Sequence, residues 1–144
     1  MAQHDARRIY DSVNAAARWL AAFDDALQRR DSLAAAELFL PDGHWRDILA
    51  FTWHIETMDG TAQIQATLSE TVAKTQPKSF RADPKRTPPR WVTRAGTEAV
   101  EALFSLETAV GRGSGVLRLV PDPRALGHLC AWTHSTTLDE LTGF

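Results

Sequence analysis

The chain has 144 residues, a length that predicts a single domain with one hydrophobic core. Hydrophobic residues make up 44% of the chain and charged residues 24%, which excludes a disordered or fibrous protein. The net charge of −2 gives no support to a nucleic-acid-binding surface, and the single cysteine excludes a disulfide framework and a cysteine-based zinc site.

The N-terminal residues carry no targeting signal. Residues 1–11 are polar and charged, so we expect a loose extension rather than a signal peptide. No run in the chain approaches the roughly 20 apolar residues that a membrane helix needs. The sequence therefore predicts a cytoplasmic protein that forms one domain over residues 1–144 and binds neither membrane nor nucleic acid.

Helices are expected in the first half of the chain. Apolar residues recur at helical spacing over residues 13–27, and Asp11 or Ser12 supplies an N-cap. Ser32 is a candidate cap for a short second helix, which ends before the Pro-Asp-Gly turn at 41–43.

A strand and a third helix follow. Residues 44–54 are rich in aromatic and branched side chains, which indicates a strand. Its period of two places Trp45 and Asp47 on one face and His44 on the other. After the turn signal at 59–61, apolar residues recur every four positions and predict a helix that ends near residue 75.

The second half of the chain predicts strands. The proline-rich residues 76–90 indicate a loop or an edge strand, and strands are expected over 100–110, 116–120 and 128–138. The alternation of the last strand places four side chains on one face: Cys130, Trp132, His134 and Thr136. Helices followed by antiparallel strands predict an α+β fold, in which a strongly curved sheet wraps around the first helix and encloses a cone-shaped ligand cavity.

Two local phrases, ELFLPDGHWRD and MDGTAQIQATL, carry a family resemblance. Together with the order of the elements, they resemble the nuclear-transport-factor-2-like superfamily, which includes SnoaL-like cyclases and ketosteroid isomerases. The resemblance spans residues 14–140. It implies a cone-shaped, antiparallel or mixed sheet around N-terminal helices. It also implies a homodimer, which would pair through the sheet face bearing Glu101, Leu103, Ser105 and Glu107.

Three further segments resemble a narrower group. GHWRDILAFTWHIET, WVTRAG and ETAVGRGSGVLRLVPDP are similar to the SnoaL-like domain at the N-terminus of bacterial flavin-containing monooxygenases. In those proteins a flavin- and NADPH-binding oxygenase follows immediately. The resemblance implies that this chain is such a leading domain or a free-standing relative, with a flavin monooxygenase module as a partner.

Departures from the isomerase pattern bear on catalysis. The resemblance places the proton-shuttling carboxylate of those enzymes at Asp47. Their first-helix tyrosine is matched by Phe23, and their late-strand acid falls in the stretch 115–117, which has no acid. Oxyanion donors are each worth on the order of 3–4 kcal/mol, so their absence argues against steroid-type isomerisation.

Asp47 and His134 are the candidate catalytic residues. A desolvated Asp47 would act as a general base or as a polar ligand contact; alternatively, it forms a structural pair with an arginine. His134 would serve as an acid beside Asp47, or be a hydrogen-bonded core histidine. No histidine spacing typical of a metal site occurs, so no metal is expected.

Aromatic side chains are the candidate walls of the cavity, because flat rings suit an apolar or aromatic ligand. The candidates are Trp45, Trp53, Trp132 and Phe23, with ordinary core packing as the alternative for each. The glycine-rich stretch GRGSG at 111–115 lacks the spacing and the following helix of a dinucleotide site, so no cofactor is expected.

Three functions are compatible with these patterns. The first is a non-catalytic pocket domain that binds a small apolar or aromatic molecule, as an accessory to a flavin-dependent monooxygenase. The second is a cofactor-independent cyclase, dehydratase or isomerase with Asp47 as general base. The third is a dimerisation module with a filled core.

Overall fold

The computed structural model describes residues 11–142. Residues 1–10 of the expected N-terminal extension lie outside the described part, as do residues 143 and 144. The described elements are α2 (Ser12–Gln28), α3 (Ser32–Ala36), β1 (Phe39–Ile48), β2 (Ile55–Asp59), α4 (Gly60–Thr75), β3 (Lys78–Ala82), β4 (Arg90–Arg94), β5 (Thr97–Glu107), β6 (Gly111–Pro121) and β7 (Leu129–Leu141). No helix within residues 11–142 has the length and apolar character needed to cross a membrane.

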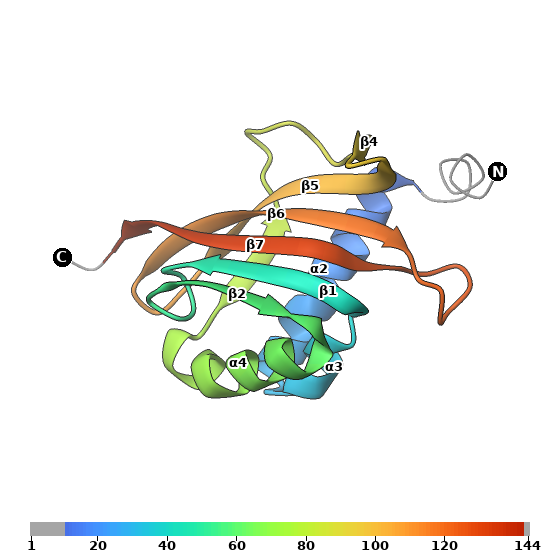
Figure 1. The fold of residues 1–144 in the computed structure, drawn as a ribbon. Helices are drawn as coiled ribbons and strands as arrows, with labels where there is room; N and C mark the ends of the chain where they lie inside the picture. The colour runs from blue at the N-terminus through green and yellow to red at the C-terminus, as the bar shows by residue number, and fades with distance from the viewer. Residues whose placement is uncertain (1–10, 143–144) are drawn as a thin grey trace.

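A curved, mixed sheet covers one side of the helices (Figure 1). Its strand order is β2-β1-β7-β6-β5-β3, and β4 pairs with β5. The pairing of β1 with β7 is parallel, and the other pairings are antiparallel. This arrangement confirms the predicted α+β fold with a curved sheet around N-terminal helices.

Aspartate side chains cap the starts of α2 and α3, whereas α4 begins after Asp59 without a side-chain cap. Asp11 accepts hydrogen bonds from the backbone N–H groups of Val13 and Asn14 at the start of α2. At α3 the cap is Asp31 rather than the predicted Ser32. Helix α4 ends at Gln76, whose positive φ of 48° turns the chain toward β3.

The strand predicted over residues 44–54 is wrong in its second half. Strand β1 starts earlier, at Phe39, and ends at Ile48; β2 begins at Ile55. The intervening residues 49–54 form a loop, in which Leu49 and Trp53 both adopt positive φ angles. The cause is Asp47, whose carboxylate binds backbone N–H groups of the loop and so stops them from pairing as a strand.

The core lies between α2, α4 and the inner face of the sheet. The predicted alternation is confirmed over residues 100–106, since Val100, Ala102, Phe104 and Leu106 are all buried in this core. The strand ends at Glu107 rather than at residue 110, and Val110, expected on the same buried face, is exposed in the turn to β6. Gly115 on β6 faces Phe104 on β5, and a Cβ atom at Gly115 would collide with the Phe104 ring and with the Ser135 carbonyl oxygen. The glycine therefore lets the Phe104 ring lie against the sheet beside β7.

Candidate functional site

An aromatic cage surrounds His134 in the interior of the cone. The Phe104 ring stacks on the imidazole with centroids 5.1 Å apart and planes 2° apart. Phe23 of α2 and Phe39 of β1 approach it edge-on at 5.1 and 5.7 Å. The ring of Trp19, one turn earlier on α2, lies 5.4 Å away. Four rings from three elements, α2, β1 and β5, thus enclose one imidazole.

His134 is a buried polar residue whose ring nitrogens have no hydrogen-bond partner in the described chain. Its side chain is 2% exposed, and neither Nδ1 nor Nε2 has a hydrogen-bond partner among residues 11–142. Burial lowers the pKa of His134 to about 3, so the imidazole is neutral near pH 7. An unmade hydrogen bond on a buried polar group costs about 1–3 kcal/mol. The imidazole is therefore the polar feature of the cone that a ligand would satisfy.

The Asp47 carboxylate is fully buried and holds the loop that follows it. Its Oδ2 accepts hydrogen bonds from the N–H groups of Phe51 and Thr52 at 2.9 and 2.8 Å, and from the Thr52 hydroxyl at 2.9 Å. Its Oδ1 accepts the Thr136 hydroxyl at 2.5 Å. The Trp45 indole N–H in turn donates to the Thr136 hydroxyl at 2.9 Å. The structural pairing considered for Asp47 therefore involves its own loop and Thr136, not an arginine.

The structure does not join Asp47 to His134. On the parallel strands β1 and β7, Asp47 is level with Thr136, and His134 is level with Trp45. The donors to Asp47 are Phe51, Thr52 and Thr136, and both nitrogens of His134 are without a partner in the described chain. Asp47, the predicted base, and His134, the predicted acid, therefore form no hydrogen bond through which they could share a proton.

The predicted wall residues separate into different environments. Phe23 belongs to the cage, and Trp45 is fully buried against the edge of Phe51 with ring centroids 4.9 Å apart. Trp53 is 50% exposed on the loop at 49–54. Trp132 packs beside Cys130, in a cluster separate from the main core. Only Phe23 of the four touches the ring of His134.

The predicted common face of the last strand is wrong. The pairing of β6 with β7 shifts register between Arg118 and Leu119, opposite Trp132. This bulge adds one residue to β7, so Cys130 and Trp132 lie on the outer face, whereas His134 and Thr136 point inward. Trp19, Phe39 and Phe104 complete the cage, although the sequence did not predict them as lining residues. Helical spacing marks Trp19 as core-facing, but no local pattern shows that it meets His134.

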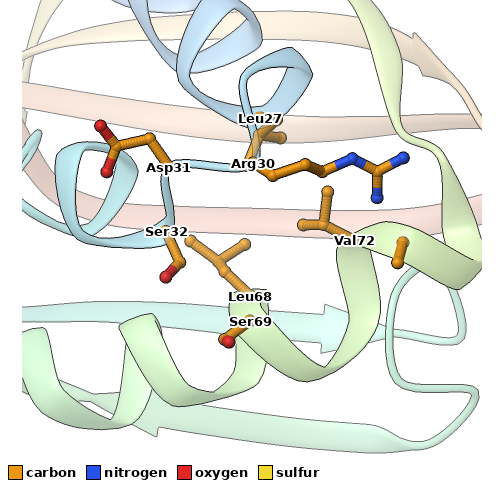
Figure 2. A pocket seen from close by; sticks show the side chains of 8 residues that line it. Leu27, Arg30, Asp31, Ser32, Leu68, Ser69 and Val72 are labelled. Carbon is orange, nitrogen blue, oxygen red and sulfur yellow. The ribbon is translucent and has the colours of Figure 1, made fainter.

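Cavities open at the surface, outside the cage. A groove of about 280 Å³ runs between the end of α2 and α4, with Leu27, Leu68 and Val72 along it and Arg30 and Asp31 at its rim (Figure 2). A second hollow, of about 240 Å³, lies beside Trp19 and the start of β7. Aromatic rings occupy the interior around His134, where the sequence predicts an open cavity.

Residues 11–142 contain no group of three histidine, cysteine or carboxylate side chains placed to share a metal ion. The chemistry that the site can supply is therefore that of the cage itself: apolar ring surfaces and one neutral imidazole, which offers one donor and one acceptor.

Comparison with known proteins identifies the fold of the chain but no protein family. No protein-family model matches the chain, and no curated protein matches it. Solved structures do. An NTF2-like protein with a cystatin-like fold from Novosphingobium aromaticivorans has a TM-score of 0.56 and 14% identity, and the match covers 94% of this chain and 86% of that one.

Two further structures extend the likeness. ActVI-ORFA from Streptomyces coelicolor has a TM-score of 0.59 and 17% identity, covering 85% of this chain and 92% of its own. Nuclear transport factor 2 from Cryptosporidium parvum has a TM-score of 0.56 and 13% identity, covering 88% and 93%. The chain therefore has the NTF2-like fold, also described as cystatin-like. At these identities the likeness extends to the fold alone.

Proposed function

We propose that the chain is a non-catalytic domain that binds a small, mainly apolar ring compound inside the cone, with a polar group of the ligand hydrogen-bonded to His134. The observation that carries this proposal is the buried imidazole without a partner. A hydroxyl, carbonyl or amine group on the ligand would satisfy one of the two ring nitrogens. The surrounding rings offer the flat apolar walls that suit an aromatic ligand.

Entry of a ligand requires one ring to move, and Phe80 is the best placed to do so. It packs on Phe23 and Phe104 with centroids 5.2 and 6.0 Å away, but it comes from β3, a five-residue edge strand with an irregular register. Ser79 beside it has a positive φ of 59°. Trp19, by contrast, is tied by its indole N–H to the Leu38 carbonyl oxygen at 2.8 Å. Displacement of Phe80 would expose the cage beside His134.

The burial and hydrogen bonding of Asp47 favour binding over catalysis. Its carboxylate is fully buried, Oδ2 accepts hydrogen bonds from Phe51 and Thr52 of its own loop, and Oδ1 accepts one from Thr136. A cofactor-independent cyclase, dehydratase or isomerase would need this carboxylate to face its substrate. Under that alternative, Asp47→Asn would abolish turnover while leaving ligand affinity intact.

A second candidate function is favoured by the filled interior. The rings that enclose His134 are in mutual contact, as in an ordinary core, with Trp19 stacked on Phe23 at 4.9 Å. A domain with such a core would serve as a scaffold or a dimerisation module. Homodimer formation through the face of Glu101 and Leu103, and the partnership with a flavin monooxygenase module, remain predictions from the sequence resemblance.

A matched pair of probes tests the binding proposal. We expect 2-naphthol, which carries a hydroxyl, to bind the wild-type chain about three- to tenfold more tightly than 2-methylnaphthalene, because one hydrogen bond to His134 contributes about 1 kcal/mol. His134→Leu should remove this preference, and His54→Leu on the exposed loop should retain it. Titration calorimetry measures both affinities. If neither probe binds the wild-type chain, the result favours the scaffold function. If both bind with equal affinity, the result excludes His134 as the hydrogen-bond partner of the hydroxyl.

A further inference from the structure

The outer face of the sheet carries a compact group of hydrogen-bond donors from three neighbouring strands, β1, β7 and β6 (Figure 1). The register aligns them in two rows. In the first row His44 is level with Thr133, and Thr133 with Arg118. In the second row Arg46 is level with Ser135, and Ser135 with Val116. Together with His134, whose ring points into the cage on the other face, these six residues line a hollow of about 290 Å³, and no carboxylate is among the residues that line it.

The existing bonds of these residues leave donors available in the hollow. Arg118 uses its Nε toward Glu101 at 3.0 Å, so its two terminal amino groups remain. The Ser135 hydroxyl oxygen accepts the Val116 N–H at 3.1 Å, which leaves its hydrogen to donate. Arg46 is exposed and forms no ion pair with a carboxylate of residues 11–142. The donors thus outnumber the acceptors at this place on the sheet.

The charge balance around the hollow is positive in a chain whose net charge is −2. His44 is matched by Asp59, with Nδ1 and Oδ1 2.6 Å apart. Glu101 lies on the far side of Arg118 and is shared with Arg94 at 3.2 Å. Burial opposes ionisation of Glu101, but hydrogen bonds from Arg118 and Arg94 hold its pKa below the usual value. The three arginines, Arg46, Arg94 and Arg118, therefore outnumber the two carboxylates beside the hollow, Glu101 and Asp59.

We propose that this hollow binds an oxyanion, the carboxylate or phosphate group of a small organic molecule, between Arg46 and Arg118. The planar guanidinium groups present paired N–H donors that match the oxygens of either group. Thr133 and Ser135, on β7 between the two arginines, supply hydroxyl donors from the floor. Val116 gives an apolar contact for the organic part of the ligand. This site lies on the sheet face opposite the cage of His134 and is independent of the function proposed for it.

Calorimetric titration with benzoate, phenyl phosphate and inorganic phosphate at low salt tests the proposal. We expect saturable one-to-one binding of benzoate or phenyl phosphate, and the tighter of the two identifies the group. Arg46→Gln should weaken it about tenfold or more, because a charged hydrogen bond contributes about 1.5–3 kcal/mol. Thr133→Val, which keeps shape and charge, should weaken it about two- to tenfold. Arg29→Gln removes an equal charge at the end of α2 and should leave the affinity unchanged.

Two results would overturn this inference. The first is the absence of saturable binding of either organic anion to the wild-type chain at millimolar concentration. The second is an equal loss in Arg46→Gln and Arg29→Gln with no loss in Thr133→Val, since that pattern indicates general attraction by charge rather than a built site. Near-UV circular dichroism of each variant verifies that the fold is intact, so that a lost signal reports the site.

Discussion

Acid should destabilise this protein through His134, and the size of the effect follows from its burial. The unfolded chain has an ordinary histidine pKa near 6.5, and in the folded chain burial lowers the pKa of His134 to about 3. Between these values the unfolded state binds a proton that the folded state does not. Stability therefore rises with pH from about 3 to about 6.5 and is independent of this group above that range.

The expected magnitude at pH 5 is about 2 kcal/mol. That pH lies about 1.5 units below the pKa of the unfolded chain, and each unit corresponds to about 1.4 kcal/mol. No titratable side chain is among the rings that contact His134, which are those of Trp19, Phe23, Phe39 and Phe104. A pH of 5 also avoids most carboxylate titration, including that of Glu101 and Asp122, whose pKa values are lowered.

Urea unfolding of the wild type and of His134→Leu at pH 8 and pH 5 measures the effect. The wild type should lose about 2 kcal/mol more of its unfolding free energy between these pH values than the variant does. All groups other than His134 are common to the two proteins, so their contributions cancel in the difference. Equal losses in the two proteins would refute the assignment of a buried neutral imidazole to His134.

Two further predictions concern buried polar groups. Asp47→Ala removes all four hydrogen bonds to the carboxylate and should lower the unfolding free energy, measured by urea titration, by about 3 kcal/mol or more. The control, Asp25→Ala on the surface of α2, should lower it by less than about 1 kcal/mol. Similar losses in the two variants would contradict the anchoring role of Asp47. Burial raises the pKa of Cys130 to about 11, so its thiol should react with iodoacetamide at pH 8 only when urea unfolds the chain, and rapid alkylation of the folded protein would place the thiol at the surface.

The helices and the general fold were predictable because their signals are local. The cap at Asp11 and the four-residue spacing through Ile64, Leu68 and Val72 act within one or two turns, and the structure contains both helices. The alternation in β5 works equally well because the strand is regular over eleven residues. In each case the deciding interaction joins neighbours in the sequence.

The wrong predictions for strands β1 and β7 arise where one residue changes the backbone conformation of the residues that follow it. Period two assumes an unbroken ladder, but the bulge at Trp132 exchanges the faces before and after it. Residues 49–54 have the aromatic content of a strand, yet the carboxylate of Asp47 binds two of their N–H groups more locally than a partner strand would. Neither event leaves a mark in composition or periodicity.

The cage itself depends on a glycine that no periodic pattern explains. Phe104 can lie flat on His134 only because Gly115 beneath it has no side chain. The resemblance places the second acid of the isomerases in this same stretch of β6, where the space is now taken by an aromatic ring. An acid at Gly115 would collide with Phe104, so the packing that buries His134 leaves no room for one at this position. One small residue thus directs the interior of the cone toward ring packing around His134.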